Sequence, residues 1–460
     1  MKLAGTCTAV TRGICSMLAG ALALNVVVAQ EENLIEVKSA NVLNVRYVGN
    51  QEVRELIGNV HIVQSSPGEV IKIWCDSASR YMETDKIELF GNVKLVRDNV
   101  TLISTEAVYF GNERRAEMTK GVRLIRGHSV LTSRFGEYFA QEKRAHFKGS
   151  VRVVDSTSST LSDELTYFEE EEKSIAVGSV QVFNSEDNLT VFGDSLIYLE
   201  KQKYTIVPKN PKMMQVDTAS SGLIDTLLVV SRVMEAYQDT LQRFIARGDV
   251  VMVRNDFAAR CGEATYFLKR DRIVLGDQPD SGPPAKAVRP SDRVVRAGAG
   301  LAGQPVVWHE ENQLTGDSIV ITTKERKLRS VYVEGRAMAV SRADSVRRQR
   351  FDQLTAREIT MYFYDGKIAQ IDAERNATSL YYLFEEAEPN GVNRSSGDRI
   401  VMEFQDGKVD RIKIVGGVEG KYFPESMITR REPEYNLDGF KWIANRPRRQ
   451  QLQIVSESYE

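Results

Sequence analysis

Few side chains in this sequence are spaced so that they could bind a metal or carry out catalysis. The four histidines lie at unrelated positions and do not form the spacing of a metal site. His61 alternates with aliphatic neighbours, so we expect it to point to solvent. No Gly-x-Ser-x-Gly sequence is present. We therefore expect no catalytic residue, no metal and no cofactor.

A repeated aspartate is the one feature that could suggest an enzyme. It occurs at Asp163, Asp194, Asp317 and Asp398. Paired carboxylates in a cleft are typical of glycoside hydrolysis, so a carbohydrate-active repeat enzyme is one alternative. Such a pair should converge in one place, whereas these residues recur once per repeat. We expect each to begin a strand and to hydrogen-bond the backbone of its own turn.

The elements that hold these residues are copies of a unit of about thirty residues. The unit contains a strand that ends in an aromatic residue, a charged turn, a second strand and a glycine followed by alternating aliphatics. The first five glycines are spaced 33, 30, 28 and 29 residues apart. The glycines of the pattern are Gly58, Gly91, Gly121, Gly149, Gly178, Gly248, Gly335 and Gly416.

Polar turns with a basic residue separate the strands of each unit, as at Glu142-Lys143 and Asp365-Gly366-Lys367. Asp-Gly between alternating runs predicts a β-hairpin, and the glycine predicts a bend into the next one. The sequence thus predicts an all-β, elongated array of stacked β-hairpin repeats, because one unit alone cannot bury its apolar face.

The array is predicted over residues 30–422, with two departures and a tail. Pro and Gly make residues 280–304 a flexible insertion, and residues 423–460 an irregular C-terminal tail. The period loosens at 208–244, where an amphipathic helix is an alternative to strands. We favour strands, because Met234 to Tyr237 ends like the other aromatic-ended strands. Cys75 and Cys261 occupy the same position in distant units, so both are predicted to be free thiols.

The strongest functional signal is an apolar stripe, because alternate residues of the strands are aliphatic or aromatic in every unit. Two such faces closing on each other would form either a filled sandwich core or an open apolar trough. The candidate lipid-groove residues are Val60, Ile62, Val93, Leu95, Val122, Leu124, Val151, Val153, Leu165, Tyr167, Val180, Val182, Leu196 and Tyr198.

The pairing of Gly-Asn-Val-x-Leu/Ile-Val with a downstream Asp/Glu-x-Leu-x-Tyr, as in residues 58–81, 91–110 and 178–199, resembles the OstA-like (LptA-type) family. The resemblance extends over about residues 33–422. It implies a β-jellyroll, or β-taco, with two opposed sheets that hold the acyl chains of lipopolysaccharide during transport to the outer membrane. The chain is longer than a single-module bridge protein of that family, and no C-terminal membrane barrel is evident.

The resemblance also implies partners. These are lipopolysaccharide or a related lipid, and other jellyroll components of the transport machinery that stack at edge strands. The net charge of −2 gives no basic excess, which argues against nucleic acid. A structural or adhesive surface β-solenoid that binds other proteins remains the alternative function. Its interior would be filled and its binding residues would lie on outer loops.

Residues 1–29 have the composition of a secretory signal peptide, with Lys2 and Arg12 as its charges and a short apolar run that ends at Ala29. We therefore expect export to the periplasm, with association with the outer membrane left open. N-terminal sequencing of the protein from its native host should give a start near Gln30. An intact Met1, or a start within the repeats, would contradict this.

Overall fold

The computed structural model describes most of the chain, namely residues 34–66, 69–186, 188–218, 224–237, 240, 242–254, 257–277, 304–324, 327–344, 346–364, 366–385, 388–405 and 408–453. The predicted signal peptide (1–29) and all of the predicted insertion (280–304) except its last residue lie outside the described residues. None of the short helices in the described part has the length and hydropathy to cross a bilayer.

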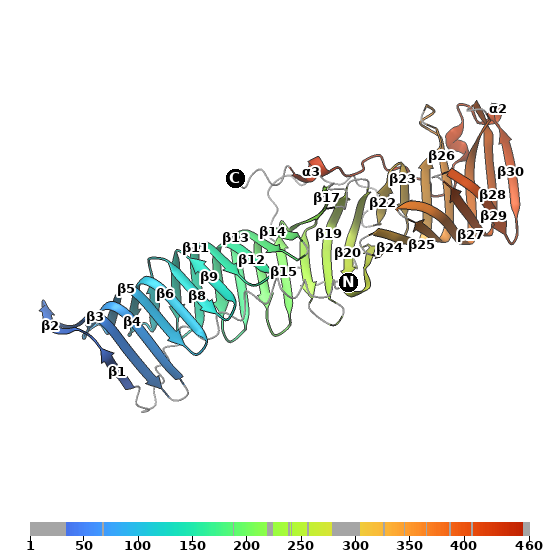
Figure 1. Cartoon of the computed structure of the whole chain (residues 1–460). Helices are drawn as coiled ribbons and strands as arrows, with labels where there is room; N and C mark the ends of the chain where they lie inside the picture. Colours follow the sequence, from blue (N-terminus) through green and yellow to red (C-terminus); the bar gives the residue numbers. More distant parts are fainter. Residues whose placement is uncertain are drawn as a thin grey trace. The chain divides into compact units, whose positions relative to one another are not determined.

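The described residues are almost entirely antiparallel strands, and nearly all pair with strands close to them in the chain (Figure 1). The first sixteen are β1 (Leu34–Ser39), β2 (Val42–Val48), β3 (Gln51–Ser66), β4 (Glu69–Tyr81), β5 (Lys86–Arg97), β6 (Val100–Phe110), β7 (Arg115–Met118), β8 (Val122–Arg126), β9 (Ser129–Ser133), β10 (Phe135–Phe139), β11 (Arg144–Val154), β12 (Ser158–Phe168), β13 (Lys173–Asn184), β14 (Leu189–Leu199), β15 (Tyr204–Lys209) and β16 (Lys212–Thr218).

The remaining strands are β17 (Ile224–Val230), β18 (Val233–Tyr237), β19 (Arg243–Arg254), β20 (Phe257–Phe267), β21 (Arg272–Gly276), β22 (Val306–His309), β23 (Asn312–Thr315), β24 (Ser318–Lys324), β25 (Lys327–Arg342), β26 (Phe351–Tyr364), β27 (Lys367–Glu385), β28 (Glu388–Gln405), β29 (Lys408–Val415) and β30 (Glu419–Pro424). The helices are η1 (Leu268–Arg270), α2 (Glu425–Ile428), η2 (Glu432–Tyr435) and α3 (Arg449–Gln453). The described part of 208–244 is thus mainly strand, as predicted.

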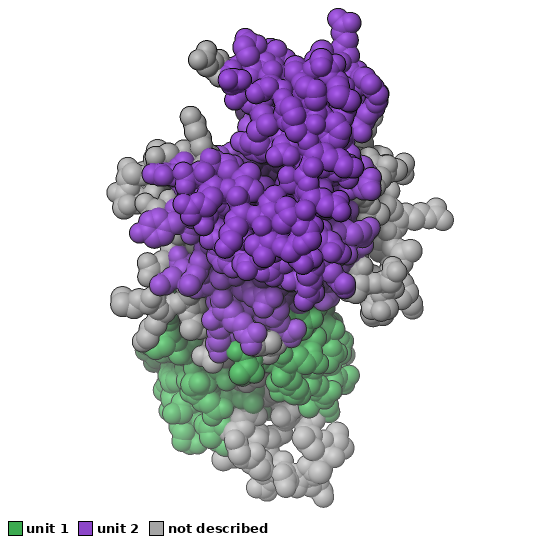
Figure 2. Space-filling view, turned by 90° about the vertical axis from the view of Figure 1, so that its right-hand side faces the viewer, with its two compact units in different colours: residues 1–216, 235–240 green, residues 217–234, 241–460 purple. Residues whose placement is uncertain are grey.

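The strands form two compact units (green and purple in Figure 2). Unit 1 comprises residues 1–216 and 235–240, and unit 2 comprises residues 217–234 and 241–460. The all-β prediction is confirmed. The sequence analysis treated residues 30–422 as a single array and did not anticipate the division into two units.

The repeated glycine lies inside a long strand in β3, β5, β11, β13, β19 and β25, and these strands bend there. In β11, Gly149 and Ser150 both have positive φ, and the register with β12 shifts between Lys148 and Val151. The prediction that the glycine joins one hairpin to the next is therefore wrong, because the bend lies inside the strand. A two-residue bulge turns the strand so that its two arms contribute to opposed faces.

The two arms of the bent strands pack against each other. One apolar cluster of unit 1 contains Val60, Cys75 and Val93 from one arm and Ala78 from the other arm. Side chains of both arms therefore meet inside the fold, as the β-jellyroll prediction requires. The predicted hairpin turns are also present, and residues such as Lys143 adopt positive φ there.

Three of the recurrent aspartates, Asp163, Asp317 and Asp398, lie against the glycine bend that follows them in the chain. Asp163 lies in the middle of β12, so the prediction that it begins a strand is wrong. A Cβ atom added at Gly178 would lie 2.2 Å from its Oδ2 atom. At the equivalent corner, the backbone N–H of Asp317 donates to the carbonyl oxygens of Glu334 and Gly335. The observed role of these aspartates is thus structural, and the residue that each contacts lies on the neighbouring strand.

The chain after β30 folds back over unit 2 as a C-terminal strap, which we define as residues 425–453. It runs past β28, β26, β23 and β22 to β17 (Figure 1). Two buried glutamines hold its backbone. Gln353 accepts from Leu437 N–H and donates to Asn436, while Gln313 accepts from Ile443 N–H and donates to the carbonyl of Lys441.

The strap makes the outer face of unit 2 different from that of unit 1. In β25, Met338 and Val340 point away from the interior, yet they are 5% and 2% exposed. The equivalent outward residue in β11, Arg152, is exposed. Ile428 and Leu437 of the strap belong to the same apolar cluster as Met338 and Val340. The strap therefore forms a third layer on this arm of the sheet.

Replacing the bend glycine Gly178 with alanine should destabilise the protein. Its φ of +79° is unfavourable for alanine by about 1–2 kcal/mol, and the added Cβ would clash with Asp163. Gly127→Ala is the control, because Gly127 also has positive φ but nothing lies within 4 Å of its added Cβ. Urea unfolding followed by circular dichroism should show the larger loss for Gly178→Ala. Adding Asp163→Ala should restore part of it, and equal losses in both single variants would contradict the contact.

Replacing Gln353 with leucine should loosen the strap. Leu437 N–H would lose its acceptor, at a cost of about 1–3 kcal/mol for an unpaired buried group. Hydrogen exchange at Leu437 should accelerate, and trypsin should cleave faster after the exposed Lys441. Arg431→Ala is the control, because its ion pair with Glu434 is exposed and contributes little. Unchanged exchange in Gln353→Leu would show that the strap is held by its other contacts.

Candidate functional site

The structure places twelve of the fourteen candidate groove residues in the core of unit 1, each at most 4% exposed. Ile62 and Leu95 are half-buried. The buried residues are Val60, Val93, Val122, Leu124, Val151, Val153, Leu165, Tyr167, Val180, Val182, Leu196 and Tyr198. The predicted apolar stripe is therefore continuous across the strands, and the packing of its side chains changes along unit 1.

One row of paired residues shows this change. It consists of Val37, Ile62, Ile73, Leu95, Leu102, Leu124, Leu131, Val153, Thr160 and Val182. Val37 is 49% exposed, Ile62, Ile73 and Leu95 are half-buried, and every member from Leu102 onward is at most 3% exposed. Water therefore reaches the row at the β1–β5 end, and side chains fill the interior from β6 to β13.

A second inner row explains why the interior closes. Across neighbouring strands a tyrosine alternates with a small residue: Tyr109, Ala116, Tyr138, Ala145, Tyr167, Ser174, Tyr198 and Thr205. Large and small side chains that alternate in this way fill a layer without voids. The sequence analysis named Tyr167 and Tyr198 but missed the small partners, which the register alone reveals.

The edge formed by β1 and β2 is the apolar surface at the open end of the row. All of β2 is exposed, including Leu43 at 64% and Tyr47 at 69%. Both strands pair with β3 on one side. The sequence analysis did not single out this edge, although its alternating Val42–Val48 run is visible in the sequence.

Cys75, Cys261 and His61 all pack against neighbouring side chains. Cys75 and Cys261 are free and buried, as predicted. Burial, with a smaller contribution from nearby carboxylates, raises the pKa of Cys75 to about 11 and that of Cys261 to about 12, so both thiols stay protonated. His61 lies on the outer face, as expected, in one row with Trp74 and the exposed Lys94. It is half-buried there, because its ring stacks on Trp74 with 4.7 Å between the ring centroids. Within the described ranges, no group of His, Cys, Asp and Glu could hold a metal.

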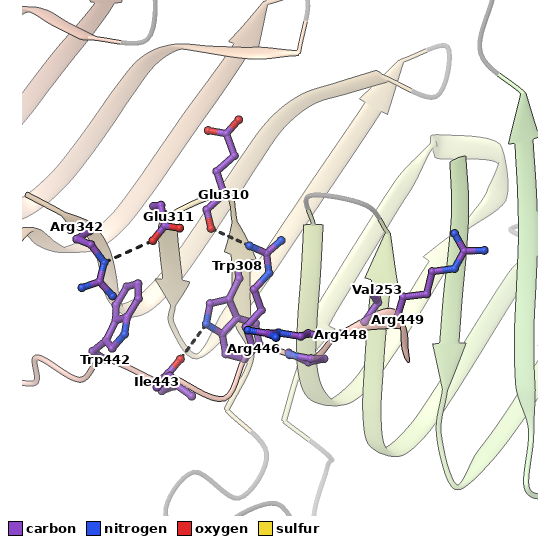
Figure 3. A pocket seen from close by; sticks show the side chains of 12 residues that line it. Val253, Trp308, Glu310, Glu311, Arg342, Trp442, Ile443, Arg446, Arg448 and Arg449 are labelled. Atoms are coloured by element: carbon purple, nitrogen blue, oxygen red, sulfur yellow. Dashed lines mark hydrogen bonds and ion pairs between the residues drawn. The ribbon is translucent and has the colours of Figure 1, made fainter. Parts of the chain in front are cut away.

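Unit 2 has a cavity of about 730 Å³ on its outer face, where the strap crosses β22 (Figure 3). The indole of Trp308 donates to the carbonyl of Ile443, and Arg446 donates to the carbonyl of Glu310. Arg342 lies over the ring of Trp442 and forms an ion pair with Glu311. The residues that line the cavity are Val253, Trp308, Glu310, Glu311, Arg342, Trp442, Ile443, Ala444, Arg446, Pro447, Arg448 and Arg449.

The cavity was not foreseen in the sequence analysis, which treated residues 423–460 only as an irregular tail. Its two tryptophans lie about 130 residues apart in the chain, and only the path of the strap brings them together. An indication was present in the strands themselves, since Ala337 to Val340 are apolar on both faces. Such a run predicts a strand covered on both sides.

Comparisons with known proteins agree with the motifs of unit 1. No curated protein matches the sequence. Among solved structures, the chain is similar to LptH of Pseudomonas aeruginosa, the LptA-homologous periplasmic component of its lipopolysaccharide transport device. The two are 13% identical, the match covers 36% of this chain and 95% of LptH, and the TM-score is 0.24.

The family comparison covers the strands that carry the inner rows. Residues 32–186 match the family described as OstA-like protein. This range includes β1 to β12 and most of β13, and with them the glycine bends of Gly58 to Gly178. Residues 32–186 are therefore similar to the OstA-like family, as the repeated glycine and aromatic motifs of this segment predicted.

Proposed function

We propose that this protein is a periplasmic carrier or bridge that holds the acyl chains of lipopolysaccharide on their way to the outer membrane, and that it is not an enzyme. The observation that supports this most directly is the inner aliphatic row of unit 1, which is open to water at one end. This open end lies within the residues that match the OstA-like family.

The open end suits an acyl chain in chemistry and size. The step from Val37 across Ile62 and Ile73 to Leu95 crosses three strand spacings, or about 14 Å. Each buried CH₂ group of a lipid contributes about 0.8 kcal/mol. Contact with these side chains would therefore favour binding without any catalytic group. Beyond β6 the core is filled, so longer contact requires the two arms to separate.

The exposed edge at β1 and β2 supports the partner part of the proposal. A terminal strand with unpaired backbone groups can add a strand from another protein. Its apolar side chains continue the inner rows, so a second jellyroll stacked here would extend the same apolar surface. The partners would be other jellyroll components of the transport machinery.

Photo-crosslinking with lipopolysaccharide tests the proposal. A p-benzoylphenylalanine residue at Ile62 or Leu95 should capture lipid, and Leu165 in the filled core should capture less. The matched controls are the exposed outward neighbours Lys94 and Arg152, which should capture none. The same probe at Tyr47 should capture a partner protein in cells.

Two results would count against the proposal. Equal lipid capture on inward and outward positions would indicate non-specific adsorption. No lipid capture at either inward position, together with protein capture on outer loops, would favour the structural or adhesive solenoid instead.

A further inference from the structure

Two arginines lie on the inner face at the open end of unit 1. Arg54 of β3 is paired with Arg80 of β4, and Arg80 is paired with Ile87 of β5. Ile87 is in turn paired with Tyr109, the first tyrosine of the second inner row. The two arginines therefore continue this row on the inner face. Both are exposed, whereas every member of the row from Ala116 onward is buried.

The arginines and the aliphatic row lie on opposed arms of the same interior. Close to the bend, Ala78 of one arm and Val60 of the other belong to one apolar cluster. The next inward-facing residue away from the bend is Arg80 on the first arm and Ile62 on the second. The open end thus has one aliphatic wall and one wall that carries guanidinium groups. These two walls suit a ligand with an apolar part and an anionic part.

Each of these arginines has one carboxylate partner among the described residues. Nε of Arg54 donates to Oε1 of Glu52 at 2.7 Å. Nη2 of Arg80 donates to Oδ1 of Asp85 at 2.9 Å. Each contact uses a single guanidinium nitrogen, and all four side chains are at least 30% exposed. Exposed ion pairs of this kind contribute little to stability, so an anion can join or replace the carboxylate at small cost.

The direct pairing of Arg54 with Arg80 favours a bound anion. Directly opposite residues of antiparallel strands have Cβ atoms about 4.5–5.5 Å apart, and like charges at such positions destabilise a sheet. Each carboxylate partner is held by only one of the two arginines. A phosphate group could accept hydrogen bonds from both guanidinium groups and so offset their repulsion. Charges that only protect a terminal sheet edge would not need to be opposite each other.

We propose that Arg54 and Arg80 bind the phosphate of a phosphorylated lipid whose acyl chains lie against the opposite aliphatic wall. This inference rests on the proposed carrier function and adds to it the part of the lipid that the open end recognises. A phosphate monoester carries a charge of about −1.5 to −2 at neutral pH and has oxygens for both arginines. A fatty acid carries a single negative charge, so the paired arginines favour a phosphorylated headgroup.

Equilibrium binding of labelled lipid to the immobilised full chain tests this inference. The probes are lipopolysaccharide and its dephosphorylated form, which has the same acyl chains. The phosphorylated lipid should bind at least tenfold more tightly, and Arg54→Gln with Arg80→Gln should abolish this preference. Arg46→Gln with Arg123→Gln is the matched control and should keep it, because both of these arginines are exposed and alternate with the inward-facing residues.

Thermal melts of the variants show whether folding is retained. Both double variants should melt like the parent chain, because the ion pairs that they remove are exposed. Should the glutamine variant not fold, Arg54→Lys with Arg80→Lys takes its place. It keeps the charge but loses the planar fork, so the preference for phosphorylated lipid should fall at least threefold.

Three results would overturn the phosphate site. The parent chain could bind both lipids equally, or both double variants could lose the preference to the same extent. Inorganic phosphate could also displace the lipid at an equal or lower concentration, which would assign the arginines to free phosphate.

Photo-crosslinking at Ile62 separates this inference from the carrier function. Equal capture of both lipids at Ile62, with no preference in the binding assay, would support the carrier and overturn the phosphate site. Phosphate-dependent binding that requires the two arginines, without capture at Ile62, would support the phosphate site and contradict the carrier. Absence of binding for both lipids would overturn both.

Discussion

The bend in the glycine-bearing strands is the constraint on which the rest of this structure depends. A strand of eleven or more residues would otherwise present one flat face with nothing to cover it. Two consecutive residues with positive φ, such as Gly178 and Ser179, turn the strand so that its two arms can meet. The corner works only if every successive strand bends at the same level. This requirement explains why the glycine recurs with so regular a spacing, and why an aspartate from the preceding strand packs against it.

Once the corner is fixed, side-chain size decides whether the space between the arms is open or filled. In unit 1, tyrosines alternate with alanine or serine from one strand to the next, and the interior is closed where this alternation is complete. At β1 to β5 the alternation is less regular and the terminal pair has no strand beyond it among the described residues, so aliphatic side chains remain accessible. In unit 2 the corresponding arm is also apolar on its outer side, and the strap covers it.

The sequence was sufficient to predict those features that depend on the spacing of residues along the chain. The all-β class, the turns and the inward parity of Val151 and Val153 all follow from alternation and spacing. It was insufficient for features that depend on register or on distant segments. The sequence predicted a change of direction at Gly149, but it did not show that one strand continues through this bend. A glycine before an aliphatic run is equally compatible with a turn between two strands. The pairing of Tyr138 with Ala145 requires the register, and the meeting of Trp308 with Trp442 requires the path of the strap.

The strap also has a consequence for the order in which the protein can fold. Residues 425–453 are the last part of the described chain to be made and, if the protein is exported, the last to emerge. Until they arrive, the outer face around Val340 and Leu380 has no cover, although strands β19 to β28 can already pair with one another. The second unit therefore passes through a stage with an exposed apolar sheet, when association with other chains or with a folding helper is most favourable. The outer face of the first unit carries exposed arginines such as Arg123 and Arg152 and is not covered by the strap.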